Sequence, residues 1–130
     1  MKYLLDVNAL VALGHLEHVH HERVARWLNK QQSSQLLTCS ITELGFVRVL
    51  AQAPNYGFTV EDAKSLLQSL KDAPGFSFTL IPDEQSVSQL PAWVKTGGQT
   101  TDGHLLQLAK AHGSLLATLD AKIPGAFVIP

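Results

Sequence analysis

The sequence predicts an α/β fold, a three-layer α/β/α sandwich with a central parallel sheet. Short apolar segments alternate with longer ones whose apolar residues recur every three or four positions, as strands and helices do. The short segments are apolar along their whole length, which is typical of parallel strands covered on both faces. We expect a single domain over residues 1–130, because this length and a hydrophobic content of 45% allow one sizeable core.

The first third of the chain contains two strands and two helices. Tyr3–Leu5 is an apolar run that predicts a strand, and Asn8 can cap a helix over Ala9–Leu13. His21–Lys30 has apolar residues at helical spacing and predicts a second helix. Leu36–Cys39 is expected to be a buried strand.

Two further helices follow, each with a recognisable start. Ser40 and Glu43 have the spacing of a capping box at the head of the first. Thr59 opens the second, and Pro74-Gly75 ends it. The first helix continues after its capping box with Leu44, Val47 and Leu50, and in the second Ala63, Leu66, Leu67 and Leu70 share a face.

The last part of the chain continues the alternation. Gly113 ends the longest of its predicted helices, and Asp120 ends the strand after it. The expected elements are a strand over Phe76–Ile81, a helix over Glu84–Leu90, a flexible loop over Lys95–Gln99, a helix over Asp102–His112, and strands over Leu115–Leu119 and Phe127–Ile129.

Composition narrows the class of protein. The single cysteine, Cys39, excludes an internal disulfide and every multi-cysteine zinc pattern. Asp6 interrupts the stretch that a signal peptide would need, and no segment is long and apolar enough to span a bilayer. We therefore expect a soluble cytoplasmic protein without a membrane partner. A formal net charge of -1 means that any contact to nucleic acid is local.

Four carboxylates are expected on one rim of the sheet. Ligands of an open parallel sheet bind outside the carboxyl ends of its strands. Asp6 ends the first strand and Glu43 lies in the first turn after the second. Asp102 starts a helix, and Asp120 ends the strand that follows this helix.

Such a cluster predicts a site for a divalent cation. Carboxylates held together repel one another, and no Lys or Arg is spaced to pair with each of them. Oxygen ligands suit Mg²⁺ or Mn²⁺, which can position a water for attack on a phosphodiester. The side chains expected to support these ligands from behind with further oxygen atoms are Asn8, Ser40 and Thr118.

Each carboxylate also has a plain structural explanation. Glu43 can close a capping box with Ser40, and Asp102 can favour a helix N-terminus. Asp6 can cap a helix, and Asp120 can belong to a turn. The coincidence of all four at one edge favours the metal site.

The basic residues and the histidines are secondary features. Arg48, about one turn beyond Glu43, is the cation expected nearest the acidic pocket. Arg23 and Arg26 lie on a stripe that can follow a phosphate backbone, although a solvated helix face explains it more simply. A dense histidine cluster lacks the second ligand pair of a zinc site, so a loop near the pocket is favoured. Its members are His15, His18, His20 and His21.

The ordered motifs resemble those of PIN-domain ribonucleases, and the length is similar to that of small VapC-type toxins. The motifs are Leu4-Leu5-Asp6-Val7-Asn8, Ser40-Ile41-Thr42-Glu43, Thr101-Asp102 and Leu115-Leu116-Ala117-Thr118-Leu119-Asp120. The resemblance implies a PIN-like fold whose acidic quartet is Asp6, Glu43, Asp102 and Asp120, with Thr118 as its polar helper. It also implies Mg²⁺- or Mn²⁺-dependent endonucleolytic cleavage of RNA, such as tRNA or rRNA. The partners that it implies are a cognate antitoxin and a second copy of the toxin.

Three other functions remain to be weighed. An aspartate-dependent phosphatase needs a second Asp two residues after the first, where this chain has Asn8. A phospho-receiver domain needs an acceptor Asp near mid-chain, and none occurs between Asp6 and Asp62. A non-catalytic PIN-fold module that binds RNA or protein is the stronger alternative, and the intact quartet argues against it.

Overall fold

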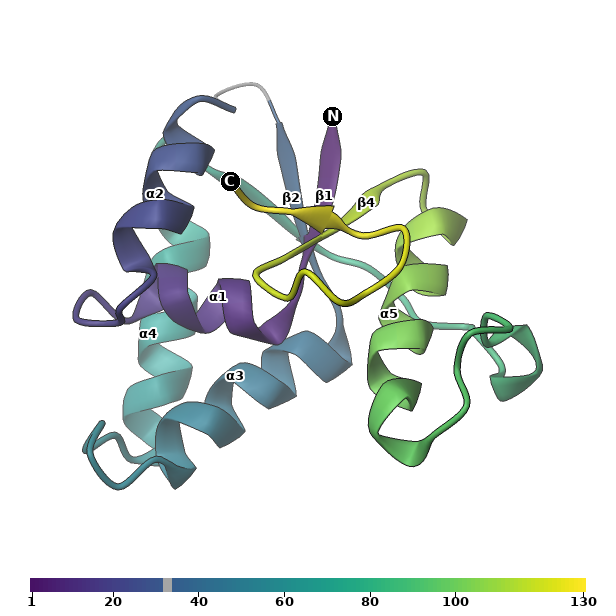
Figure 1. Cartoon of the computed structure of the whole chain (residues 1–130). Coiled ribbons are helices and arrows are strands. Elements are labelled where there is room, and N and C mark those ends of the chain that lie inside the picture. The colour runs from purple at the N-terminus through teal and green to yellow at the C-terminus, as the bar shows by residue number, and fades with distance from the viewer. Residues whose placement is uncertain (32–33) are drawn as a thin grey trace.

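A computed structural model describes residues 1–31 and 34–130, which form a parallel sheet with helices on both faces (Figure 1). The five strands are ordered β3-β2-β1-β4-β5, so that β1 pairs with β2 on one side and with β4 on the other. Every pair is parallel, which confirms the predicted sheet. The strands are β1 (Lys2–Leu5), β2 (Gln35–Thr38), β3 (Ser77–Leu80), β4 (Leu115–Thr118) and β5 (Phe127–Val128).

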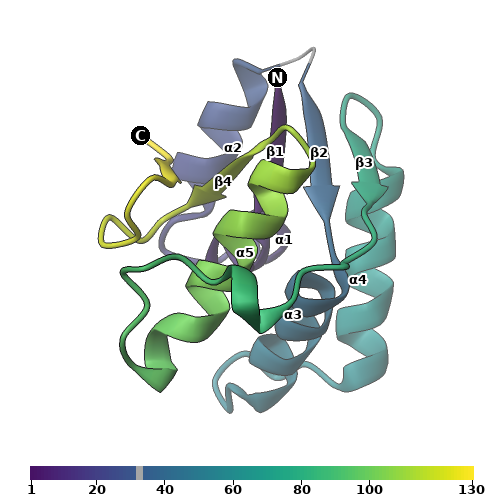
Figure 2. The same ribbon diagram turned by 90° about the vertical axis from the view of Figure 1, so that its right-hand side faces the viewer.

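Four helices lie on one side of the sheet and one lies on the other. Figure 1 shows α1 to α4 on one side, and Figure 2, turned by 90°, shows α5 in front of the strands. No helix in the described ranges combines the length and the apolar surface that a membrane crossing requires. The helices are α1 (Val7–Gly14), α2 (His21–Asn29), α3 (Ser40–Gln52), α4 (Val60–Asp72) and α5 (Thr100–Ala111).

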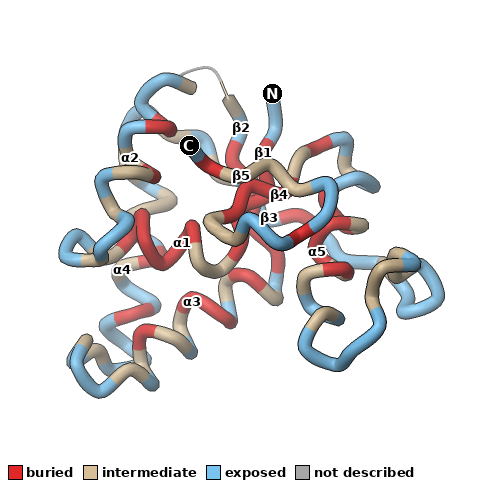
Figure 3. The backbone as a smooth tube through the Cα atoms, viewed as in Figure 1, coloured by how far each residue is buried: buried red, intermediate tan, exposed pale blue. Residues whose placement is uncertain are grey.

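The buried residues form two hydrophobic clusters, and the central strand contributes to both (Figure 3). Tyr3 and Leu5 pack in the cluster that includes α1 to α4, whereas Leu4 packs in the cluster that includes α5. Successive side chains of a strand point to opposite faces, so a strand covered on both sides must be apolar at every position. This explains why β1 shows no polar alternation.

The order of the strands reverses direction at β1. From β1 the chain proceeds to β2 and β3 on one side, and it then returns through α5 to β4 on the other. In parallel sheets such a reversal opens a crevice at the carboxyl ends of the two strands. Asp6 and Asp120 follow these two strands, and the Asp6 backbone N–H donates to the Ala117 carbonyl at 2.9 Å.

Glycine lets α3 approach α1 beside this crevice. A Cβ atom at Gly45 would lie only 2.6 Å from Cγ2 of Val7, and one at Gly14 would lie 2.8 Å from the ring of Phe46. Real Cβ atoms do not approach this closely, so larger residues would push the helices apart. The two glycines therefore set how closely α3 packs against α1.

The predicted helix over Glu84–Leu90 is wrong, because only the single 3₁₀ turn Val87–Gln89 forms there. The Gln89 side chain accepts a hydrogen bond from the Ser86 backbone, and the Ser86 hydroxyl accepts one from the Ser88 backbone. These two bonds form a capping box that starts the turn at Val87 instead of at Glu84, and Pro91 disfavours helical backbone in the residue before it, so the turn does not extend.

Two predicted helix starts are also wrong. The first helix begins at Val7 and is capped by Asp6, whose Oδ1 accepts a hydrogen bond from the Val7 N–H at 2.8 Å, not by Asn8. The third begins at Ser40, and the residues that cap it are Cys39 and Thr42, not Ser40 and Glu43. In both places the helix starts directly after the strand, which leaves the carboxylate of Glu43 available for other contacts.

Candidate active site

A cleft of about 420 Å³ opens at the carboxyl edge of the sheet. Asp6, Asp102 and Asp120 all line it, as the sequence predicted, together with Asn8 and Thr101. These residues come from the ends of β1 and β4 and from the first turns of α1 and α5. The topology therefore gathers side chains that lie more than one hundred residues apart in the sequence.

Asp6 is the most constrained of the three aspartates. It is only 6% exposed, and its second oxygen, Oδ2, accepts a hydrogen bond from the Thr118 hydroxyl at 2.7 Å. Burial raises the pKa of Asp6, and the negative charge of Asp120 raises it further, while the hydrogen bonds from Thr118 and Val7 oppose this rise. The two donors fix the orientation of the carboxylate and oppose the effect of burial on its pKa.

The charges of the three aspartates are coupled. Burial raises the pKa of Asp102, and the negative charges of Asp6 and Asp120 raise it further. Among residues 1–31 and 34–130, no Lys or Arg forms an ion pair with any of the three. The cleft thus holds mutually repelling carboxylates whose charges are not balanced by an ion pair with any described Lys or Arg.

Thr118 and Asn8 tie the ends of β1 and β4 together. The Thr118 hydroxyl is fully buried and accepts hydrogen bonds from the Asn8 side-chain amide at 3.2 Å and from the Asp120 backbone at 3.0 Å. The Asn8 carbonyl oxygen accepts one from the Leu119 N–H at 3.0 Å. Two of the three predicted supporting residues, Asn8 and Thr118, are therefore in contact with the aspartates or their neighbours. Ser40 lies exposed at the first residue of α3, and its supporting role stays a prediction.

Glu43 was predicted to share one pocket with the three aspartates, but it is not among the residues that line the cleft, and it is held differently. Its Oε2 atom accepts a hydrogen bond from the Thr38 hydroxyl at 2.6 Å and from Lys71 Nζ at 2.8 Å. The side chains of Glu43 and Lys71 are each 23% exposed. The expectation that no cation pairs with each acid is therefore wrong for Glu43, because α4 brings Lys71 to it from 28 residues away.

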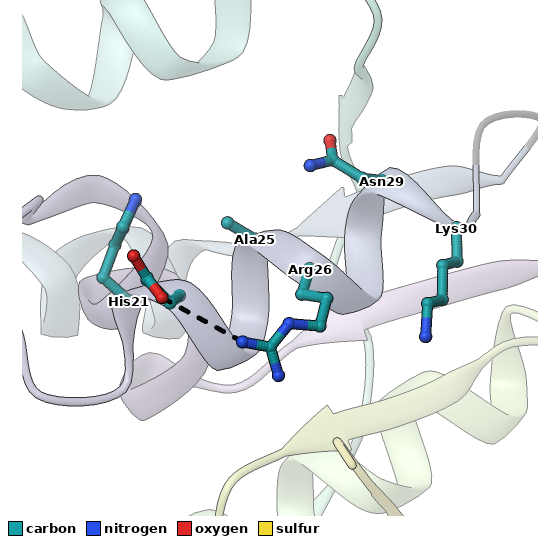
Figure 4. A pocket seen from close by; sticks show the side chains of 6 residues that line it. His21, Ala25, Arg26, Asn29 and Lys30 are labelled. Atoms are coloured by element: carbon teal, nitrogen blue, oxygen red, sulfur yellow. Dashed lines mark ion pairs between the residues drawn. The ribbon is translucent and has the colours of Figure 1, made fainter.

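The cations predicted to contact RNA separate into two groups. Arg48 lines the cleft, on the same α3 helix as Glu43. Arg23 donates from Nε and Nη2 to the carbonyl oxygen of Ile129, at 3.0 and 2.6 Å, and so anchors the C-terminal end of the chain. Arg26 lies over an outer hollow of α2 and forms a 4.0 Å ion pair with Glu22 (Figure 4). A contact of Arg23 or Arg26 to RNA stays a prediction.

The histidine loop reaches the cleft through one member. His18 lines it, whereas His21 Nδ1 bonds to the Ala12 carbonyl and the His15 ring packs on Tyr56 at a centroid distance of 4.7 Å. Tyr56 also lines the cleft, and nothing in its sequence surroundings indicates this. Within the described residues, no three or more His, Cys, Asp or Glu side chains form a group placed to hold a metal ion.

Comparisons with known proteins agree on the family. The sequence matches the PIN domain over residues 3–126. It is 38% identical to Ribonuclease VapC38 of Mycobacterium tuberculosis over 123 residues, which cover 92% of this chain and 86% of the relative. It is 36% identical to Ribonuclease VapC44 of the same organism over 137 residues, which cover 97% and 94%.

Two solved structures share the fold. The crystal structure of VapC20 of Mycobacterium tuberculosis, described as a Sarcin-Ricin loop cleaving toxin, aligns with a TM-score of 0.67 and 12% identity. That alignment covers 98% of this chain and 99% of the other. VapBC2 from Rickettsia felis, solved with a DNA fragment from its promoter, aligns with a TM-score of 0.63 and 14% identity, covering 98% and 96%. At these identities the likeness concerns the fold alone.

The ion pair of Glu43 is testable by changing Lys71. Lys71→Met leaves a partly buried carboxylate without its cation, so we expect the free energy of unfolding in urea to fall by about 1 kcal/mol. Lys64→Met breaks the pair with Glu61, in which both side chains are largely exposed, and should change it by no measurable amount. Equal losses in the two variants would contradict a specific role for Lys71.

Proposed function

The chain belongs to the PIN domain family, and from that premise we propose that it is an endoribonuclease, the toxin of a toxin–antitoxin pair. The proposal is carried by one observation: three aspartates that form no ion pair with any described Lys or Arg share a cleft at the carboxyl edge of the sheet. The curated relatives named as VapC ribonucleases match nearly the full chain at 33 to 38% identity, which supports the same activity here.

We propose that the cleft binds Mg²⁺ or Mn²⁺ through Asp6, Asp102 and Asp120. The chemistry of the donor set suits such a cation, because it offers carboxylate oxygens only and the neighbouring aspartates raise the pKa of Asp6 and of Asp102. In the described residues the three side chains do not yet form a group placed to hold the ion. When bound, the cation would supply positive charge for the phosphate oxygens and activate a water. The aspartates would move closer together as the cation relieves their repulsion.

The chain's own residues prepare this chemistry. Val7 and Thr118 hold both oxygens of Asp6, so that its orientation is set before RNA arrives. Asn8 holds the backbone at the end of β4, from which Asp120 projects. We propose that Glu43, held by Thr38 and Lys71 through Oε2, uses Oε1 to orient the attacking water or to contact the cation.

The phosphatase and the non-catalytic module have less support than the ribonuclease. A phosphatase needs an acid where the chain has Asn8, and the Asn8 side chain is already engaged by Thr118 and Leu119. A non-catalytic module would have no need for three repelling carboxylates in an open cleft, because their charges repel RNA as well as one another.

We expect the protein to cleave RNA with Mg²⁺ or Mn²⁺ and to stop when a chelator is added. Asp6→Asn keeps the oxygen and the shape of the side chain but removes the charge, so cleavage of total RNA should fall by at least about a hundredfold. Asp72→Asn changes an exposed aspartate at the end of α4 that does not line the cleft, so it is the matched control and should cleave at the wild-type rate. Cleavage by a folded Asp6→Asn protein at the wild-type rate would sink the assignment.

Metal binding is testable without activity. Mn²⁺ in large excess over its dissociation constant should raise the melting temperature by several degrees, because it binds only the folded state. Asp102→Asn removes one proposed ligand and should lose most of this shift, whereas Asp72→Asn should retain it. An equal shift in all three proteins would contradict binding at the aspartates. A smaller rise in the melting temperature of Glu43→Gln would indicate that Glu43 is a ligand of the cation, and a full rise would indicate that it orients water instead.

We further propose a cytoplasmic location, a cognate antitoxin that covers the cleft, and pairing with a second copy of the chain. VapBC2, whose fold this chain shares, supports the antitoxin. Light scattering on the purified protein should give about twice the chain mass of 14.1 kDa. A monomer mass at every concentration tested would exclude the pairing and leave the nuclease proposal intact.

A further inference from the structure

The cleft is also lined by residues that differ in chemistry from the aspartates. They come from α1, the α1–α2 loop, α3 and the α3–α4 loop, and they are His18, Arg48, Tyr56, Val11 and Val49. Together they offer a guanidinium group, a phenol ring and an imidazole ring beside two apolar side chains. None of these side chains is a ligand of the kind that Mg²⁺ or Mn²⁺ prefers.

Arg48 is a cation without a partner in the described part of the chain. Its side chain is exposed, and within residues 1–31 and 34–130 it forms no ion pair, although three aspartates line the same cleft. A planar guanidinium group in this position matches a phosphate oxygen pair, and phosphates adjoin the scissile one in every RNA strand.

The rings of Tyr56 and His18 each have a partner within the protein. Tyr56 packs against the His15 ring, whose centroid also lies 5.5 Å from that of Phe58. His18 Nδ1 accepts a hydrogen bond from the His20 backbone at 3.0 Å, so the neutral imidazole carries its hydrogen on Nε2. Burial lowers the pKa of His18, and the neighbouring histidines lower it further, which favours this neutral donor form.

We propose that His18, Arg48 and Tyr56 form a subsite for the nucleotide next to the scissile phosphate of a single-stranded RNA. The inference rests on the proposed function and adds to it the strand that the cleft selects. Arg48 binds a neighbouring phosphate, Tyr56 stacks on an unpaired base, and His18 donates from Nε2 to the same nucleotide. Aromatic rings stack on bases that are free of a duplex, so RNA in loops or unpaired segments is favoured.

The subsite predicts that removing the ring of Tyr56 weakens binding of an RNA strand with bases but not of one without bases. We would measure binding by fluorescence polarisation, with EDTA present to prevent cleavage, using a labelled single-stranded uridine 12-mer and its abasic ribose-phosphate counterpart. Tyr56→Leu should weaken binding of the uridine strand roughly tenfold and leave the abasic strand unchanged. Tyr56→Phe retains the ring and should bind both strands as the wild type does.

Arg48 should act on the phosphates and not on the base. Arg48→Gln should weaken both strands roughly tenfold and reduce the dependence of log K on log salt concentration by about 0.7. Lys110→Gln removes the same charge from the last turn of α5 and should leave binding unchanged. The proposal is overturned if Arg48→Gln weakens binding no more than Lys110→Gln does. It is also overturned if Tyr56→Leu is folded and its affinity for both strands falls equally.

These outcomes are separable from the nuclease proposal. A protein that binds the uridine strand through Arg48 and Tyr56 but cleaves no RNA with Mg²⁺ or Mn²⁺ overturns the proposed activity and keeps the subsite. A protein that cleaves RNA while both variants bind as the wild type does overturns the subsite alone. If circular dichroism finds Tyr56→Leu unfolded, the comparison of Arg48→Gln with Lys110→Gln decides.

Discussion

The pairing of β1 with β4 is the contact on which the rest of the site depends. It joins the start of the chain to a strand more than one hundred residues later, and it makes β1 central by leaving its other edge for β2. Because the strand order reverses there, the two carboxyl ends open a crevice instead of being covered by a helix. Asp6 and Asp120 face this crevice because they are the residues that follow those strands.

The acids of the site differ in how the protein treats their charge. Asp6, Asp102 and Asp120 repel one another and have no ion pair in the described part of the chain, so they favour a cation from solution. Glu43 is already balanced by Lys71 and by a hydrogen bond from Thr38. The three aspartates of the cleft are thus poised for a ligand, whereas Glu43, which is not among the residues that line the cleft, is held still by the fold.

The cleft is lined by two sets of side chains with different chemistry. Carboxylates at the strand ends suit a cation, whereas Arg48, Tyr56 and His18 on the helix and loop side suit phosphate and base. An RNA strand carries both kinds of partner at every nucleotide, so one groove can place the phosphate to be cut and hold its neighbour. The loop between α1 and α2 contributes His18 to the second set. His15 and His21, on either side of His18, anchor this loop to the fold.

Sequence by itself determined the parallel sheet, the order of its main elements and the edge on which Asp6, Asp102 and Asp120 meet. These follow from periodicity and from where each apolar run stops, which are local properties. It failed on the helix over Glu84–Leu90 and on the caps, where neighbouring polar side chains compete for the same backbone groups. Only the tertiary structure decided that Lys71 pairs with Glu43, and only it supplied the atoms through which Thr118 and Asn8, expected from the sequence as supports, hold Asp6 and the end of β4. Such partners lie 28 to 112 residues apart, and their contacts exist only once whole helices and strands have packed.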